Sequence, residues 1–295
     1  MYKINNFKVR KGSIIFTNSY FIKNLFKLIK NLDSNLDLIL VTNQTDLLLD
    51  EYIYNFKPDC IKKWYSINVE HESEDVIPLP LGLSNSYSPK NLLPEDFINF
   101  KENNESKKIE KVYVNFNKNT NFKERESLYD KFQEEDWAVV ENPNLDKSEY
   151  YNNLSRYKFS LAPWGNGVDT HRIWESLYLG TVPITKYHHT FSTSSNLPIL
   201  FVNDYEEINK SLIENFLKDN SSKNYNYELL NSKYWTDLIS KDSINNSDYQ
   251  YTKTNNLISL YYLYNYRIKQ LILRYYKILI FYSKKIFKVI NLVKK

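Results

Sequence analysis

Residues 158–185, KFSLAPWGNGVDTHRIWESLYLGTVPIT, decide the fold that this sequence predicts. The pattern predicts a strand over 158–163, a Gly-Asn-Gly turn, a helix that begins at Asp169 or Thr170, and a second strand. Two glycines let backbone N–H groups approach an anion closely, and a helix start directs its free N–H groups and positive dipole end to the same place. The segment therefore predicts a site for a phosphorylated ligand.

Two charged residues of this predicted helix support the same interpretation. Arg172 falls in the first turn, where a cation opposes the helix dipole and lowers stability unless an anion is bound. Glu175 follows three residues later on the same face, within reach of the same ligand. The alternative is an exposed ion pair, which would stabilise the helix by only about 0.2–0.5 kcal/mol. The glycine turn that precedes the pair favours ligand binding.

The run PWGNGVDTHRIWESLYLGTVPI resembles the donor-binding segment of exostosin-like (family 47-type) glycosyltransferases of the GT-B superfamily. The matching positions are Pro163, Gly165, Asn166, Gly167, Asp169, Thr170, His171, Arg172, Trp174, Glu175, Leu177, Gly180 and Pro183. The resemblance implies a nucleotide-sugar donor, with Arg172 near the diphosphate and Glu175 accepting hydrogen bonds from ribose hydroxyls. Trp164 departs from the pattern, because relatives often carry a basic residue there.

The amino-terminal third of the chain predicts a parallel sheet. Apolar, β-branched runs at 12–17, 37–42, 61–67 and 76–81 predict strands, and 20–32 has the spacing of a helix. A strand, a helix and a strand in so short a segment indicate a βαβ unit. Polar residues follow the four strands: Thr17, Asn18 and Ser19; Asn43, Gln44 and Asp46; Asn68, Glu70 and His71; Gly82, Ser84 and Asn85. Because the carboxyl ends of parallel strands share one edge, these clusters are expected to form one wall of a ligand site.

A second series of strands and helices follows the polar stretch at 101–110, which we interpret as a linker. Strands are predicted over 111–117, 137–141 and 198–203, in addition to the two in the central segment. Helices are predicted near Arg125, over 148–157 and over 204–218, the last capped by Asp204. Strands that alternate with helices in both halves predict an α/β fold with two Rossmann-like domains, whose parallel sheets face an interdomain cleft, as in GT-B enzymes. Short runs in the first half, VTNQTD, KKWYSIN and IPLPLGLSN, extend the family resemblance.

Length and charge suggest how these parts are divided. With 295 residues, 42% hydrophobic and 25% charged, the chain can form two ordinary globular domains. We expect an acceptor domain over 1–105, a donor domain over 106–240 and a basic helical segment over 241–295. Residues 249–295 contain ten Lys or Arg and no acidic residue, whereas the rest of the chain has 29 basic and 35 acidic residues.

The carboxyl-terminal stretch 258–295 combines these basic residues with many Tyr and Ile. Its longest interior run without a charge, 254–266, has 13 residues, which is shorter than the roughly 20 that cross a bilayer. Two alternatives stay open: the stretch contacts an anionic membrane surface peripherally, or it packs back on the acidic first domain. With Cys60 as the single cysteine and an amino terminus that lacks a signal-peptide pattern, we expect a cytoplasmic location, peripheral on a membrane if the first alternative holds.

Three residues of the first half are candidates for the catalytic base. Sugar transfer with inversion needs a base for the acceptor hydroxyl, and this base is expected opposite the donor. Asp46 leads, although it could instead cap a helix before Leu47, and Glu70 and His71 are the other candidates. The resemblance implies that cationic side chains and helix dipoles stabilise the leaving group without a metal. The sequence has no DxD motif before the donor segment and no compact His or Cys cluster, so we expect neither a metal nor a cofactor.

Three further residues are candidates for donor binding, each with a structural alternative. Arg125, placed near a helix start, would contact an anion or else lie on a solvated face. Asn115 and Asn117 would contact the donor or cap the loop after their strand. His171 would contact a phosphate or lie buried in the core.

Together these features predict a glycosyltransferase that moves a sugar from a nucleotide-sugar donor, expected to be UDP-linked, to a hydroxyl of a glycan or glycoconjugate. Inversion is favoured over retention. The alternative is a non-catalytic module that binds nucleotide or glycan on a GT-B scaffold. Nucleic acid is not expected as a partner, because the acidic body would repel its phosphates, although aromatic and basic residues alternate in the tail as in single-strand binders.

Overall fold

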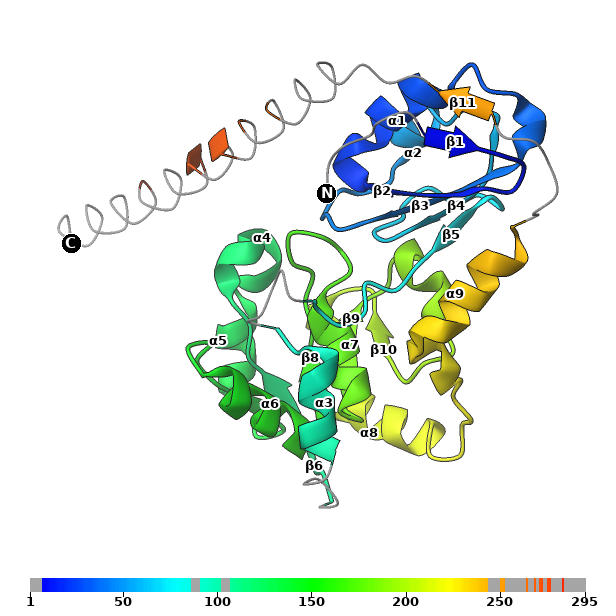
Figure 1. Ribbon diagram of the computed structural model, residues 1–295. Coiled ribbons are helices and arrows are strands. Elements are labelled where there is room, and N and C mark those ends of the chain that lie inside the picture. Colours follow the sequence, from blue (N-terminus) through cyan, green and yellow to red (C-terminus); the bar gives the residue numbers. More distant parts are fainter. Residues whose placement is uncertain are drawn as a thin grey trace. The chain divides into compact units, whose positions relative to one another are not determined.

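The computed structural model describes residues 7–85, 91–101, 107–243 and 250–252 (Figure 1). It also describes seven single positions of the carboxyl-terminal segment: 264, 268, 271, 272, 275, 276 and 283. The chain forms two compact units, 11–246 and the combination of 1–10 with 247–295. In the second unit, β1 (Phe7–Val9) pairs antiparallel with β11 (Gln250–Thr252), a pairing that the sequence does not predict.

The first half of unit 11–246 is built on a four-stranded parallel sheet. Its strands are β2 (Ile14–Asn18), β3 (Leu38–Asn43), β4 (Ile61–Ser66) and β5 (Val76–Pro78), side by side in chain order. The helices α1 (Ile22–Ile29) and α2 (Glu51–Tyr54) connect them, and Phe26 of α1 packs edge-on against Trp64. Asn18 and Asn43 are partners in register, so the predicted parallel sheet is confirmed, with polar residues at its carboxyl edge.

The second half has a five-stranded parallel sheet in the order β10-β9-β8-β6-β7. The strands are β6 (Ile109–Val114), β7 (Ala138–Val140), β8 (Tyr157–Leu161), β9 (Val182–Lys186) and β10 (Leu200–Val202). The chain runs from β6 to β7 in one direction and then continues from β8 on the other side of β6. The strand order therefore reverses between β6 and β8, which is where ligands bind in open α/β sheets.

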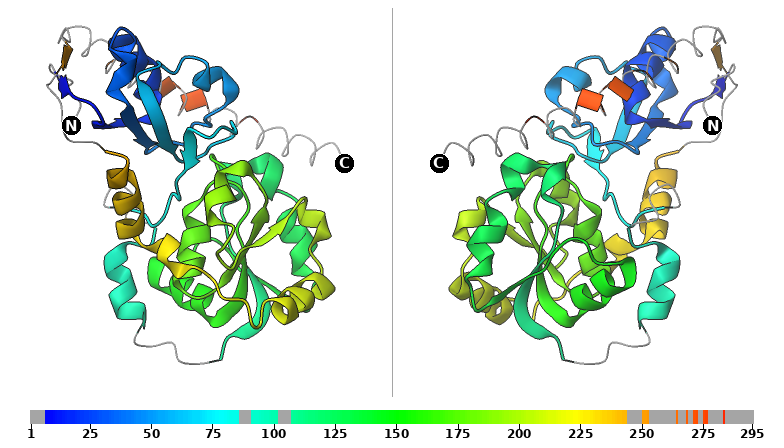
Figure 2. Two further views of the ribbon diagram at one scale, coloured as in Figure 1. Left: turned by 90° about the vertical axis from the view of Figure 1, so that its right-hand side faces the viewer. Right: turned by 90° about the vertical axis from the view of Figure 1, so that its left-hand side faces the viewer.

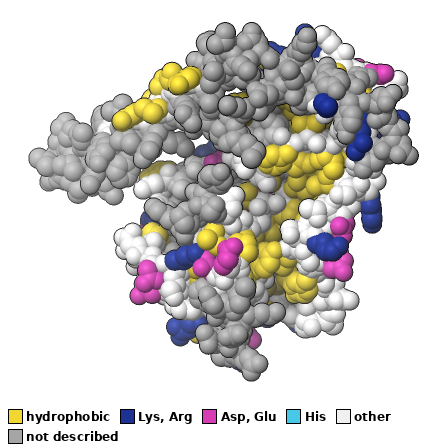
Figure 3. All heavy atoms as spheres, viewed as in Figure 1, with side chains coloured by type: hydrophobic (Ala, Val, Ile, Leu, Met, Phe, Trp, Pro, Cys, Tyr) yellow, Lys and Arg dark blue, Asp and Glu magenta, His cyan; other side chains and the backbone are white. Residues whose placement is uncertain are grey.

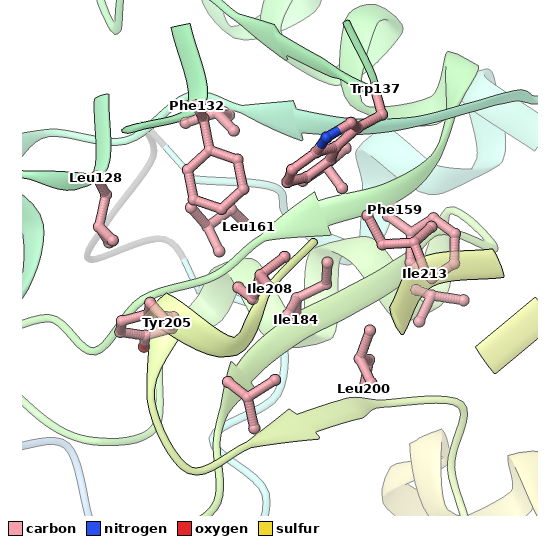
Figure 4. Close-up of a cluster of buried hydrophobic side chains, with 14 of the residues drawn as sticks. Leu128, Phe132, Trp137, Phe159, Leu161, Ile184, Leu200, Tyr205, Ile208 and Ile213 are labelled. Carbon is pink, nitrogen blue, oxygen red and sulfur yellow. The ribbon is translucent and has the colours of Figure 1, made fainter. Parts of the chain in front are cut away.

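Helices cover both sides of the five-stranded sheet (Figure 2). On one side, α5 (Leu128–Gln133) and α8 (Lys210–Asp219) pack on the strands, and Figure 4 shows this core around Phe132, Phe159, Leu161 and Ile184. On the other side, α6 (Lys147–Arg156) supplies Tyr151 and Leu154, and α7 (His171–Tyr178) follows β8. Burial of each large apolar side chain contributes about 1.5–3 kcal/mol. These two layers hold the carboxyl edge of the sheet rigidly.

The two halves share a third cluster of buried apolar residues. Ile39, Tyr65, Ile67 and Leu79 come from the first half, and the second half contributes Ala162, Ile173, Trp174, Leu177, Phe191, Leu197, Ile199, Leu229 and Trp235. Trp235 lies on α9 (Ser232–Lys241), and Asp242 just after this helix pairs with Lys63 and accepts a hydrogen bond from Tyr65. The α/β class with two parallel sheets, as predicted, is confirmed.

The predicted start of the helix over 204–218 is wrong, because a nearby polar side chain caps a different position. Asp204 caps the 3-10 turn Tyr205–Glu207, and Asn209 caps α8 three residues later. Asp46 caps no helix, since the Oδ1 atom of Asp50 accepts the hydrogen bond from the Ile53 N–H at the start of α2. Arg125, predicted near a helix start, is the last residue of the four-residue helix α4 (Phe122–Arg125), whose N-cap residue is Asn121.

The remaining predicted segments are described only in part. The expected boundary at residue 105 and most of the expected linker lie outside the described residues, between α3 (Pro94–Lys101) and β6. Most of the basic segment 241–295 also lies outside them, but the described positions 264, 268, 271, 272, 275, 276 and 283 are helical. Among the described residues, no helix has the length and apolar character needed to cross a membrane.

Candidate functional site

Arg125 joins the two loops that meet at the switch point of the five-stranded sheet. The loop after β8 is held by two hydrogen bonds, from Arg125 Nε to the Trp164 carbonyl oxygen (2.8 Å) and from Nη2 to that of Pro163 (2.7 Å). The loop after β6 is held by Nη1, which donates to the Asn117 carbonyl oxygen (2.9 Å) and to Thr120 Oγ1. One planar guanidinium therefore fixes the spacing of these loops.

The charge of Arg125 is buried without a carboxylate partner. The residue is 7% exposed, and none of the ion pairs found within 4.0 Å in the described chain involves it. Burial, together with the nearby positive charge of Arg172, lowers the pKa of the Arg125 guanidinium to about 10. A buried cation that has only neutral hydrogen-bond acceptors is costly, and a bound anion would offset that cost.

Arg172 and Glu175 lie on α7, with Tyr150 of α6 between them. The Tyr150 hydroxyl accepts a hydrogen bond from Arg172 Nη1 and lies 3.4 Å from Glu175 Oε2, and the guanidinium carbon of Arg172 stands 4.9 Å from the centre of the Tyr150 ring. Burial acts to lower the pKa of Arg172, but the neighbouring Tyr150 and Glu175 raise it above its usual value. The guanidinium therefore stays charged.

The Glu175 carboxylate is 4% exposed, so it does not form the exposed ion pair considered as the alternative. Its Oε1 atom accepts hydrogen bonds from the Tyr151 hydroxyl (2.9 Å) and from the Leu92 N–H (3.2 Å). Among the described residues, Oε2 has only the long contact with Tyr150. One carboxylate oxygen is thus fixed by the protein, and the other has capacity for a further donor.

The glycines of the predicted phosphate turn are required for close packing. A Cβ atom on Gly167 would lie 3.0 Å from both Nδ2 and Oδ1 of Asn68, and one on Gly165 would lie 3.2 Å from Arg125 Nη2. Asn68, which follows β4 and is 1% exposed, accepts a hydrogen bond from the Asp169 N–H (2.9 Å). The turn therefore packs against the first half on one side and Arg125 on the other, while Asn166 is exposed between them.

Asp169 lies at the contact between the two halves, immediately before α7. Its Oδ2 atom accepts from the Leu81 N–H and its Oδ1 atom accepts from Trp174 Nε1, both at 2.7 Å. Burial raises the pKa of this carboxyl to about 7, although the hydrogen bonds act in the opposite direction. We assign Asp169 a structural role, because the residue is 2% exposed and each of its carboxyl oxygens accepts a hydrogen bond from a donor of the protein.

The start of α7 presents one polar atom that the fold does not use. Thr170 is the N-cap residue, yet its side chain makes no capping hydrogen bond, and its Oγ1 atom is buried without a partner in the described chain. His171, the next residue, is held through Nδ1, which lies 2.8 Å from the Gly82 carbonyl oxygen. Asn115, the other predicted donor contact, is buried and donates from Nδ2 to the Asn142 carbonyl oxygen (3.0 Å).

Lys186 at the end of β9 places a cation beside Trp164. Its Nζ atom lies 4.9 Å from the centre of the Trp164 ring and forms an ion pair with Glu124. The Trp164 ring also meets the edge of the His188 ring, with 5.5 Å between their centres. Burial lowers the pKa of His188, and the negative charge of Glu70 acts in the opposite direction.

The three candidates for the catalytic base are not brought together. Glu70 is exposed and follows Val69, whose N–H donates to Thr190 Oγ1 (3.0 Å), so Glu70 lies near the segment that contains His188. The His71 ring stacks on Tyr54, with 4.0 Å between ring centres, and Asp46 is exposed in the loop after β3. No three His, Cys, Asp or Glu side chains in the described ranges lie close enough together to hold a metal ion.

A cavity of about 450 Å³ opens near the carboxyl ends of β2 and β3. Its wall combines aromatic, aliphatic and charged side chains: Ser19, Tyr20, Ile22, Lys23, Leu47, Leu48, Asp50, Tyr52 and Ile53. Lys23 Nζ lies 4.2 Å from the centre of the Tyr52 ring. Such a mixture of flat rings and polar groups suits a small polar ligand.

Sequence patterns placed Asn68 in a polar cluster at the expected site wall, but they did not identify three other residues that shape the site: Tyr150, Tyr151 and Lys186. Tyr150 and Tyr151 belong to α6, whose composition gives no sign of a ligand site. Lys186 directly follows a predicted strand. Because ligands bind at the carboxyl ends of parallel strands, its position alone could have suggested a role at the site.

No family model and no curated protein sequence matches this chain. Among solved structures, it is similar to an α1,3-fucosyltransferase, with a TM-score of 0.36 and 14% identity over 80% of this chain and 71% of that one. An α1,3-fucosyltransferase with GDP-fucose gives a TM-score of 0.35 and 14% identity over 87% and 90% of the two chains. The pneumococcal O-GlcNAc transferase GtfA in complex with UDP and GlcNAc gives a TM-score of 0.37 and 11% identity over 79% and 57%. These values are too low to carry an assignment of function, which depends on the site itself.

Proposed function

We propose that this protein is a glycosyltransferase of the GT-B type that binds a nucleotide-sugar donor at the switch point of its five-stranded sheet. The observation that carries the proposal is the buried guanidinium of Arg125, which has no carboxylate within ion-pair distance in the described chain, beside the partly buried guanidinium of Arg172. A diphosphate supplies the missing negative charge. The resemblance of residues 163–183 to the exostosin-like donor segment supports the same ligand.

Each group at the site has a role in this proposal. Arg172 and the first N–H groups of α7 contact the diphosphate, with the unpartnered Thr170 hydroxyl as a further donor. Arg125 acts through the loops that it fixes, because its N–H groups already donate to protein oxygens. Glu175 Oε2 accepts a ribose hydroxyl. As the sugar leaves, negative charge grows on the diphosphate, and these fixed cations and dipoles stabilise it.

The acceptor side is proposed in the first half, at the cavity lined by Tyr20, Lys23 and Tyr52. Aromatic rings there can cover the C–H faces of a sugar. Glu70 is proposed as the base, because it is exposed and lies near the segment that contains His188. It would take the acceptor hydroxyl proton while the acceptor oxygen bonds to the sugar and the nucleotide diphosphate departs, which gives inversion. UDP is the proposed nucleotide.

Calorimetric titration of the full chain with UDP and with GDP tests the proposal. We expect Arg172→Ala and Glu175→Ala to weaken nucleotide binding by at least about tenfold, since each removes a charged contact worth roughly 1.5–3 kcal/mol. Arg156→Ala and Glu214→Ala, which change exposed residues on α6 and α8, are matched controls and should bind as the wild type does. Unchanged affinity in both site variants would remove the proposal.

A second measurement separates an enzyme from a binding module. Incubation with nucleotide sugars in the absence of acceptor should release free nucleotide slowly through hydrolysis of the donor. This release should be lost in Arg172→Ala. Binding without any turnover, with or without glycan acceptors, would instead support a non-catalytic module.

A further inference from the structure

Six exposed apolar residues form a stripe on the helix of the carboxyl-terminal segment. They are Tyr264, Ile268, Leu271, Ile272, Tyr275 and Tyr276, all helical and between 54% and 61% exposed. Their spacing of three, four, seven and eight residues places them on one face of a helix. Apolar side chains on this segment stand at the molecular surface (Figure 3). We call these six residues the tail stripe.

The sequence around the tail stripe supplies charge of one sign. Arg267, Lys269, Arg274 and Lys277 alternate with its residues, and no Asp or Glu occurs anywhere in 249–295. A helical apolar stripe in a segment whose only charged residues are basic is the pattern of helices that lie in the interface of anionic membranes.

An anionic lipid surface matches the tail stripe in both length and charge. From Tyr264 to Tyr276 the stripe spans about 18 Å of helix. A lipid surface covers a stripe of this length completely, and its anionic headgroups complement a segment that contains no Asp or Glu.

We propose that the tail stripe lies in the surface of an anionic lipid bilayer. The aliphatic residues Ile268, Leu271 and Ile272 enter the boundary between headgroups and acyl chains, and the three tyrosines lie at headgroup level, where their hydroxyls stay hydrated. The flanking Lys and Arg contribute about 1 kcal/mol each by attraction to anionic headgroups. This proposal does not depend on the proposed glycosyl transfer.

Flotation of the full chain with lipid vesicles tests it. Vesicles of phosphatidylcholine alone are compared with vesicles that also contain phosphatidylglycerol, at low and at high salt. We expect binding to the anionic vesicles that weakens with salt, and at least about tenfold weaker binding for Leu271→Glu/Ile272→Glu. Ile14→Glu/Phe16→Glu changes two exposed apolar residues of the body and is the matched control, expected to bind as the wild type does.

A second variant separates the contribution of charge. Arg267→Gln/Lys269→Gln/Arg274→Gln/Lys277→Gln keeps the stripe and should lose most of the salt-dependent binding. Two results would overturn the proposal. Absence of vesicle binding, with a lower melting temperature in both the tail and the body variants, would mean that the stripe packs on the body. Absence of vesicle binding, with a molecular mass that halves in Leu271→Glu/Ile272→Glu, would mean that it joins two copies of the chain.

Discussion

At the scale of single residues, Tyr150 determines how Arg172 and Glu175 are held relative to each other. Its hydroxyl accepts from the guanidinium and faces the carboxylate, while its ring lies beneath the guanidinium. Tyr150→Phe keeps the ring and removes the hydroxyl. A hydrogen bond to a charged group contributes roughly 1.5–3 kcal/mol, so we expect nucleotide affinity to fall about tenfold or more with little loss of stability. Calorimetric titration with UDP and GDP, beside urea unfolding, measures both. An equal loss of affinity and stability would show that Tyr150 acts only through packing.

Asp169 makes stability depend on pH in an unusual direction. Burial raises the pKa of its carboxyl from 3.8 to about 7, so between these values the folded chain holds a proton that the unfolded chain has released. The free energy of unfolding contributed by this group therefore falls as pH rises through that window and is constant above it. The total change in the free energy of unfolding across this window is of the order of a few kcal/mol.

Asp169→Asn removes this titration. The variant is expected to be less stable than the wild type at pH 5, because an amide offers one acceptor oxygen to two donors, Leu81 N–H and Trp174 Nε1. The difference between the two free energies of unfolding should narrow towards pH 8, where the Asp169 carboxyl of the wild type has ionised. Urea unfolding of both proteins across this range is the measurement. A difference that is the same at every pH would show that Asp169 is ionised throughout.

At the scale of elements, the turn between β8 and α7 is held to the first half by the packing of Gly167 on Asn68. Gly167→Ala brings a Cβ atom within 3.0 Å of the Asn68 amide, which also accepts the Asp169 N–H. Overpacking of this kind typically costs about 1–3 kcal/mol. We expect Gly167→Ala to destabilise by this amount and to weaken nucleotide binding, because the start of α7 shifts.

A double-mutant cycle with Asn68→Ala isolates that contact. The smaller side chain makes room for the Cβ atom, so the two changes together should cost less than their sum. Additive effects in urea unfolding would mean that Gly167 is needed for backbone freedom and not for contact with Asn68.

The same elements show how far the sequence alone could lead. Periodicity and the glycine turn predicted β8, α7 and β9 closely, because their signals are local. The partners of Arg125 could not be predicted, since they are carbonyl groups of the loops after β6 and β8, which only the strand order brings together. Tyr150 and Tyr151 were missed for a similar reason: they reach Glu175 from a different helix, about 25 residues earlier in the chain.

At the scale of the whole molecule, the two parallel sheets belong to one compact unit with a shared apolar cluster. Residues 11–246 form one compact unit, and apolar residues from both halves bury one another in a shared cluster. The sequence predicted two Rossmann-like domains and could not show this cluster, because its members lie on β3, β4, α7 and α9 with no pattern that relates them. The shared cluster makes cooperative unfolding of both halves the expected behaviour.

Trp235 on α9 tests this cooperativity. It is 8% exposed, belongs to the shared cluster and donates from Nε1 to the Leu229 carbonyl oxygen at 2.9 Å. Trp235→Ala should lower the free energy of unfolding by about 3–5 kcal/mol. Trp137→Ala is the matched control, since Trp137 is also 8% exposed but lies in the core of the second half alone.

If the halves unfold together, hydrogen exchange at β3 and β8 amides should accelerate to the same extent in each variant, because both strands then exchange through one global opening. Faster exchange at β8 but not at β3 in Trp137→Ala would show that the second half opens by itself, and that the shared cluster joins two units of separate stability.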